Sequence, residues 1–148
     1  MRKWRMVCDM VIPGEAVPQG RPRWGNGHAY DPEKSRKYKA YVREVARENV
    51  PPDEREWPVT DSVKLTCIIY RGVPKSWSKR KRELALAEEI DPITKPDLSN
   101  YIKGIEDALK GVWYVDDSQV IDCPATKAYA EEPRVYVRME VKVRNGQG

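Results

Sequence analysis

The sequence predicts a small α+β domain, in which a mixed or mostly antiparallel sheet of about four strands packs against two or three helices. The length of 148 residues suits one domain with one core. Segment 63–70 is the clearest strand in the sequence, and segment 135–143 alternates apolar and polar residues, as half-buried strands do. Segment 97–110 instead repeats its apolar residues at helical spacing. We therefore expect residues 1–148 to form a single α+β domain.

The N-terminal part of the chain predicts a strand, an irregular connection and a helix. Residues 6–12 alternate loosely and are expected to form the first strand. The next segment is rich in glycine and proline, which predicts a loop or loose hairpin. Asp31 as N-cap and Pro32 at the first helical position then start a helix over 32–49. Its apolar residues at helical spacing are Tyr38, Tyr41, Val42 and Val45.

The second half of the chain predicts two helices and three strands. After the strand at 63–70, Ser76 or Ser78 is expected to cap a short basic helix at about 78–89. The helix over 97–110 has Gly111 directly after it, as a C-terminal stop requires. A short strand at 119–123 and the strand at 135–143 complete the domain. The predicted buried stripe of the 97–110 helix consists of Leu98, Ile102, Ile105 and Leu109.

Composition excludes several classes of protein. The longest apolar run is only strand-sized, so neither a membrane helix nor a signal peptide is expected. Cys8, Cys67 and Cys123 fit no zinc spacing and no disulfide framework, which favours a reducing cytoplasm. Because His28 is the single histidine, a histidine-based triad or metal site is not expected. Catalysis would therefore depend on carboxylates, lysines or hydroxyl groups.

Positive charge is concentrated in two places. The formal net charge is +4, and the first fifty residues carry 11 basic and 6 acidic side chains. A second basic run lies at 75–82. Such runs suit a polyanion, because each phosphate that is neutralised releases condensed counterions. The alternative is that they are solvated helix surface.

Acidic residues gather instead within residues 95–120. They are Asp97, Glu106, Asp107, Asp116 and Asp117. On the predicted helix, Ser99, Lys103, Glu106 and Lys110 share one face, and Asn100, Lys103 and Asp107 share the adjacent one. A short connection would allow the last two aspartates to fold back beside Asp97. The alternatives are an N-cap role for Asp97 and ordinary solvated helix charges for Glu106, Asp107 and Lys110.

Carboxylates with a lysine and without histidine have the composition of an oxygen-ligand site for Mg²⁺. One or two such ions can activate water and stabilise the charge that develops on a transferred phosphate. In such a site Lys103 would neutralise the transition state or hold the scissile phosphate. The acidic segment therefore predicts a metal-assisted phosphodiester hydrolase.

The pattern K-P-D-x-x-N-x-x-K-x-x-x-D-A-L-x-G, followed by D-D-S-Q-V, resembles the RusA family of Holliday-junction resolvases of phages and prophages. The PxGRPR segment at 18–23 and the helix after Tyr30 are also similar, so the resemblance covers nearly the whole chain. It implies a homodimeric, Mg²⁺-dependent endonuclease that cuts branched DNA in recombination and repair, without an organic cofactor and with Mn²⁺ as a substitute. By resemblance, Asp97 and Asp117 bind metal and Lys103 is the catalytic lysine.

One position departs from the family pattern. Where the family usually has P-D-x-D-N, with a second catalytic aspartate, this chain has Ser99. Glu106 lies on the same helical face but about 10 Å further along the axis, and Asp107 lies on the adjacent face. Either acid would compensate for the lost carboxylate in an active enzyme. The alternatives are a weakened or inactive protein that only binds branched DNA, and a nuclease for flaps or other branched forms.

Basic and aromatic side chains would supply the DNA contacts. Structure-selective binding is mostly to the backbone and to shape. The residues expected to contact phosphates are Arg21, Arg23, Lys34, Lys37, Lys79, Arg80, Lys81 and Arg82. Trp24, Trp77 and Tyr30 are candidates for stacking on an unpaired base, with core packing as the alternative for each.

Overall fold

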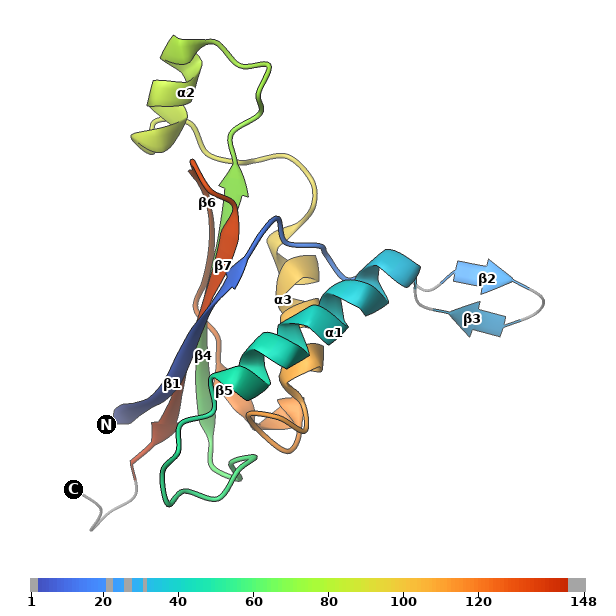
Figure 1. Ribbon diagram of the computed structural model, residues 1–148, viewed down its shortest axis with the longest axis vertical. Helices are drawn as coiled ribbons and strands as arrows, with labels where there is room; N and C mark the ends of the chain where they lie inside the picture. The colour runs from blue at the N-terminus through green and yellow to red at the C-terminus, as the bar shows by residue number, and fades with distance from the viewer. Residues whose placement is uncertain (1–2, 21–22, 26–27, 31, 144–148) are drawn as a thin grey trace.

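The computed structural model describes residues 3–20, 23–25, 28–30 and 32–143, and a five-stranded mixed sheet forms its centre (Figure 1). The strand order is β1-β7-β4-β5, and β6 also pairs with β4. The strands of this sheet are β1 (Trp4–Pro13), β4 (Val63–Gly72), β5 (Val120–Asp122), β6 (Ala125–Ala130) and β7 (Arg134–Lys142). The predicted α+β class with a mixed sheet is therefore confirmed.

The sheet combines antiparallel and parallel pairs. Strand β7 lies antiparallel to both β1 and β4, whereas β5 and β6 run parallel to β4 along its other edge. In β4, buried residues alternate with half-buried ones from Val63 to Tyr70, because every second side chain faces the core. Strand β6 was not predicted, because its sequence ATKAYA is rich in alanine, which is depleted in strands. The hydrogen bonds of its pairing with β4 stabilise the strand, although its residues have low strand propensity.

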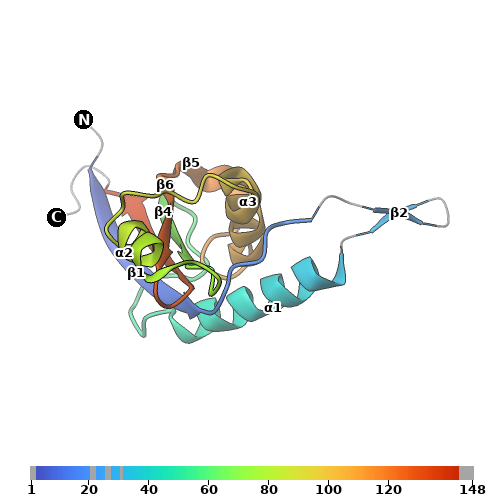
Figure 2. The same ribbon diagram turned by 90° about the horizontal axis from the view of Figure 1, so that it is seen from above.

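Two helices cover one face of the sheet (Figure 2). Helix α1 (Glu33–Glu48) buries Tyr38, Val42 and Ala46, which follow one another at helical spacing. Of the predicted stripe, Tyr38 and Val42 are buried, Val45 is half-buried and Tyr41 is exposed. Pro32 occupies its N-cap position, and the predicted cap, Asp31, lies outside the described residues. Helix α1 thus forms part of the helical layer on this face of the sheet.

Helix α3 (Leu98–Leu109) lies beside α1. Its most deeply buried residues are Tyr101, Gly104, Ile105, Ala108 and Leu109. The predicted stripe is therefore rotated: Ile105 and Leu109 are buried, but Leu98 and Ile102 are only half-buried. The rotation arises because α3 packs against α1 as well as the sheet, so the small residues Gly104 and Ala108 face inward.

Side chains from α1 fix the C-terminal end of α3. The Arg43 guanidinium donates hydrogen bonds to the carbonyl oxygens of Ala108, at 3.0 Å, and Asp107, at 3.4 Å. A cation suits these carbonyl groups, because the last turn of a helix leaves them without intrahelical partners. Trp113 lies in the loop after α3, and its indole donates to the carbonyl of Ala46 in α1 at 2.9 Å. The end of α3 and the loop after it are therefore held in place.

Two elements lie outside this layered body (Figure 1). Strands β2 (Arg23–Gly25) and β3 (His28–Tyr30) form a hairpin that projects beyond the start of α1, in agreement with the predicted loose hairpin. Helix α2 (Lys79–Leu86) lies past the end of β4. Ser78 is its N-cap, and the Ser78 hydroxyl accepts from the Lys81 amide at 3.2 Å. None of the helices within the described residues has the length and apolar character needed to cross a membrane.

Candidate active site

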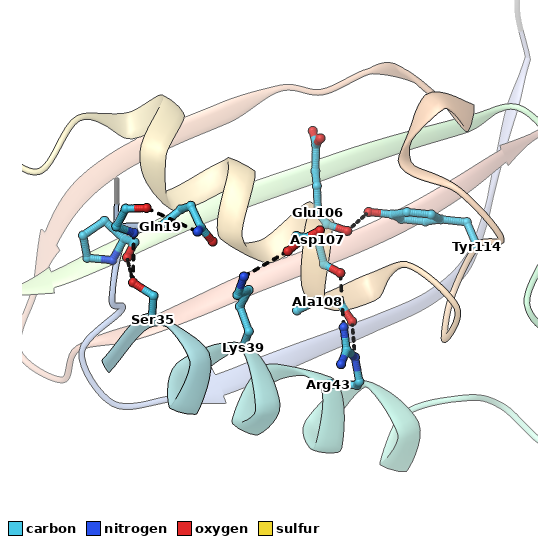
Figure 3. A network of polar contacts seen from close by, with 10 residues as sticks. Gln19, Ser35, Lys39, Arg43, Glu106, Asp107, Ala108 and Tyr114 are labelled. Carbon is cyan, nitrogen blue, oxygen red and sulfur yellow. Dashed lines mark hydrogen bonds and ion pairs between the residues drawn. The ribbon is translucent and has the colours of Figure 1, made fainter. Parts of the chain in front are cut away.

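The loop after α3 brings the D-D-S-Q motif back to that helix. Gly111 has a φ of +81°, a left-handed conformation that glycine adopts without strain, and its amide donates to the carbonyl of Tyr114 at 2.7 Å. Trp113 and Tyr114 are fully buried. The Tyr114 hydroxyl donates to the Glu106 carbonyl at 2.6 Å (Figure 3). The buried aromatic pair therefore fixes where the motif begins.

Asp116 has a structural role at the start of the short 3-10 helix η1 (Asp117–Gln119). Its carboxylate accepts from the Ser118 amide at 3.1 Å and from the Ser118 hydroxyl, and it forms a 3.0 Å ion pair with Lys110. The hydrogen bonds from Ser118, together with Lys110, lower the pKa of Asp116 to about 2. Asp116 is therefore occupied as a cap and an ion-pair partner.

Gln119 fastens the motif to a neighbouring segment. Its side-chain oxygen accepts from the amides of Val115 and Asp116, each at 2.9 Å. Its amide group donates to the carbonyls of Val59 and Asp61, also at 2.9 Å each. With both ends of Gln119 engaged, Asp117 between Asp116 and Gln119 is held on a rigid turn while its own side chain stays exposed.

The charge of Asp117 reaches Glu106 on α3. Glu106 is half-buried, and its pKa is raised, first by burial and then by the negative charge of Asp117. A hydrogen bond with the Cys123 thiol acts in the opposite direction. Two carboxylates from separate elements thus interact electrostatically, and binding of a proton or a cation would relieve their repulsion.

Asp107 lies on a different side of α3. Its carboxylate forms a 3.0 Å ion pair with Lys39 of α1, whereas the Glu106 carboxylate points away from α1 (Figure 3). Consecutive helical residues differ by about 100° in direction, which separates the two acids. Of the two acids that the sequence offered as substitutes at position 99, Glu106 experiences the charge of Asp117, whereas Asp107 is paired with a lysine.

Asp97, Ser99 and Lys103 are exposed along the outer side of α3. Asp97 occupies the N-cap position, but its side chain makes no cap hydrogen bond to the helix. Nine residues separate Asp97 from Glu106, or about 13 Å along the axis at 1.5 Å per residue. That distance is too great for both carboxylates to bind one ion directly.

Two basic side chains that no sequence motif predicted bind the segment before Asp97. The Lys127 ammonium, from β6, donates to the carbonyls of Thr94 and Pro96 at 3.1 Å each. The Arg71 guanidinium, from the end of β4, donates to the carbonyl of Lys95 at 3.2 Å. No local motif marks these two residues, because their role depends on strand pairing.

The carboxylates of this region fit a magnesium ion in their chemistry. Within the part of the chain that the structure describes, no three side chains of histidine, cysteine, aspartate or glutamate form a metal-binding group. Mg²⁺ commonly takes one or two protein carboxylates and fills its other positions with water and phosphate oxygens. Glu106 and Asp117 offer two such carboxylates, and a cation bound near them would offset their mutual repulsion, which adds to burial in raising the pKa of Glu106.

The predicted phosphate-binding residues fall into two groups. On α1, Lys34 and Lys37 are exposed, and Lys37 pairs with Glu33 at 3.1 Å. On α2, Lys79, Arg80 and Lys81 are exposed and Arg82 is half-buried. Arg21 and the side chains of Arg23, Trp24 and Tyr30 lie outside the described residues.

Comparison with known proteins points to one family. Residues 13–140 match the family described as Endodeoxyribonuclease RusA. The chain is also similar to a protein of Bacillus subtilis (strain 168) described as "Uncharacterized protein YqaN". The two are 46% identical over 139 residues, which cover 89% of this chain and 95% of the relative. The match spans both α3 and the D-D-S-Q motif.

Proposed function

The chain belongs to the RusA family of endodeoxyribonucleases, and we propose that it resolves four-way DNA junctions by Mg²⁺-dependent hydrolysis of phosphodiester bonds. One observation carries the proposal beyond the family. Glu106, near the end of α3, experiences the negative charge of Asp117, and the two carboxylates offer oxygen ligands in a chain whose net charge is +4. A basic protein that attracts DNA needs such a local acidic site to bind the cation that cutting requires.

We propose that Glu106 and Asp117 hold the ion. When bound, Mg²⁺ activates water and stabilises the negative charge that develops on the phosphate. The buried residues Trp113 and Tyr114, with Gln119, keep Asp117 in place before any ligand arrives. Pre-organisation of this kind lowers the cost of assembling the site.

Lys103 lies on the same outer side of α3, one turn before Glu106. In that position its ammonium group would contact the scissile phosphate and counter its charge in the transition state. Asp97, whose carboxylate is exposed and does not cap α3, is proposed to serve a separate ion at the start of the helix. Lys127 and Arg71 would act as positioning residues for it, through the carbonyls they bind.

We propose that two copies act together as a homodimer. A four-way junction has approximate two-fold symmetry, and its resolution requires two matched cuts. A C2 dimer would present one acidic site to each of the two strands.

The direct test is incubation of a labelled four-way junction with protein and Mg²⁺. Paired nicks near the branch point are expected, and Mn²⁺ should replace Mg²⁺. EDTA should stop cutting without preventing binding, because phosphate contacts do not need the metal. Absence of nicks at every protein concentration would contradict the proposal, and efficient cutting of flaps but not junctions would redirect it to another branched substrate.

The alternative of a protein that only binds branched DNA rests on Ser99, which is exposed where the family pattern has an aspartate. Ser99→Asp restores that carboxylate. If Glu106 compensates for it, as we propose, cutting should change by less than about threefold, because the metal site already has its ligands. A gain of about 100-fold or more from a silent wild-type protein would instead mean that the natural chain only binds. Initial cutting rates of the two proteins on one junction decide between them.

A further inference from the structure

A cavity of about 420 Å³ lies between α2 and the segment that leads into α3. Its walls include the aromatic rings of Trp77 and Tyr129, the apolar side chains of Ile90 and Ile93, and the acidic residues Glu89 and Asp91. Ile93 is 90% exposed, an unusual environment for a large apolar side chain. The proposed catalytic site does not use any of these residues.

The aromatic wall is already arranged as a stacking surface. The rings of Trp77 and Tyr129 contact each other edge to face, with centroids 5.3 Å apart. The Lys81 ammonium lies 4.0 Å from the centroid of the Trp77 ring. Both rings are half-buried, so each retains accessible surface. A cation beside accessible aromatic rings is the combination that single-stranded nucleic acid binds.

The cavity is connected to the proposed catalytic side of the molecule. Thr94 lines the cavity, and its carbonyl accepts from Lys127, the lysine that also binds the carbonyl of Pro96. Asp97 follows directly after Pro96. Tyr129 lies two residues after Lys127 on β6, on the same side of the strand. A nucleotide in the cavity would therefore lie close to the start of α3.

We propose that this cavity binds one nucleobase that has left its stack at the branch point of the DNA. The inference rests on the proposed function, since it names a part of the same substrate. The base would stack on the Trp77 ring, and Tyr129 would line the side of the cavity, because its plane is inclined by 64° to that ring. Lys81 with its exposed neighbours Lys79 and Arg80 would contact the adjoining phosphates. The carboxylates of Glu89 and Asp91 would exclude phosphate from the cavity itself.

The acidic residues also predict a preference among bases. A carboxylate accepts a hydrogen bond from the exocyclic amino group of cytosine, adenine or guanine, but thymine has no such group. Glu89 and Asp91 should therefore disfavour thymine at the position that enters the cavity.

The test uses junctions that carry 2-aminopurine, in turn, at each nucleotide next to the branch point, with binding measured in EDTA so that no cutting occurs. At one position the wild-type protein should quench the fluorescence of this base by stacking. Trp77→Phe should keep the quenching, whereas Trp77→Ala should remove it. Trp4→Ala is the matched control, because Trp4 is half-buried on β1, away from α2.

An abasic junction separates stacking from general damage to the fold. For the wild-type protein, removing the base at the responsive position should weaken binding about 10-fold. For Trp77→Ala, which should itself bind the intact junction about 10-fold more weakly, removing the base should change nothing further. This comparison holds even if the variant is less stable.

Three results would overturn the inference. One is the absence of quenching at every position while the protein still binds and cuts junctions, which would leave the proposed function intact. Another is a loss of binding affinity in Trp77→Ala that, relative to wild type, is the same on intact and abasic junctions. That result would mean that Trp77 stabilises the protein and does not contact a base. A protein that binds no junction at all would contradict both proposals.

Discussion

Asp117→Asn is expected to abolish junction cutting, with a loss of about 100-fold or more, and to leave junction binding within about twofold of wild type. Asparagine retains the size of the side chain but removes the negative charge that would hold the ion. The exposed side chain of Asp117 makes this change local, because Asp116 and Gln119 maintain the turn. Cutting rates and electrophoretic binding assays on one labelled junction measure both effects.

The neighbouring residue supplies the control. Asp116→Asn should keep the start of η1, since asparagine is as good an N-cap as aspartate, and should lose only the ion pair with Lys110. We expect less than a 10-fold loss of cutting. If Asp117→Asn lost binding in proportion to cutting, Asp117 would have a folding role instead. Equal losses in both variants would contradict the division of roles within the motif.

Glu106→Gln is expected to reduce cutting, whereas Asp107→Asn is expected to reduce stability. Glu106→Gln should reduce cutting about 10- to 100-fold, because it removes a proposed metal ligand. Asp107→Asn should retain cutting but lower the free energy of unfolding by about 1 kcal/mol, through loss of the ion pair with Lys39, whose side chain is only 13% exposed. Loss of cutting in Asp107→Asn alone would assign the compensating role to Asp107.

The free energy of unfolding should depend on pH differently in wild type and in Glu106→Gln. Because the pKa of Glu106 is raised in the folded state, the folded protein binds the proton more tightly than the unfolded chain. Without metal, wild-type stability should therefore fall as the pH rises from the ordinary glutamate pKa through the raised one. Glu106→Gln lacks this decline, and in wild type Mg²⁺ should offset it.

Thermal unfolding of both proteins from pH 4 to pH 8, with and without Mg²⁺, measures this difference. Asp107→Asn serves as the matched control and should retain the wild-type decline with pH. Identical pH profiles for wild type and Glu106→Gln would mean that Glu106 and Asp117 do not interact in solution.

The elements with strong periodic patterns were predictable from sequence. Strand β4 contains the clearest strand sequence of the chain, and Gly111 marks the end of α3 through a conformation that other residues rarely adopt. Strand β6 was not predictable, because its alanine-rich sequence forms a strand only through pairing with β4. The rotation of the buried stripe on α3 likewise depends on where α1 lies, which helical spacing does not encode.

The acids of the site were identified from sequence, but their partners were not. Helical geometry separates Glu106 from Asp107 by about 100°, yet only tertiary packing shows that α1 occupies the side of Asp107. The contacts of Lys127 and Arg71 with the segment before Asp97 come from strands distant in sequence, so no motif predicts them. The cavity beside Trp77 similarly requires Tyr129 from β6.

A crystal structure with Mn²⁺ and a junction would show which carboxylates bind the metal, since the anomalous signal of Mn²⁺ locates the ion independently of the protein. We predict a Mn²⁺ ion bound by both Glu106 and Asp117, with Asp107 still paired to Lys39. Mn²⁺ found only beside Asp97, with Glu106 free of metal, would contradict this prediction.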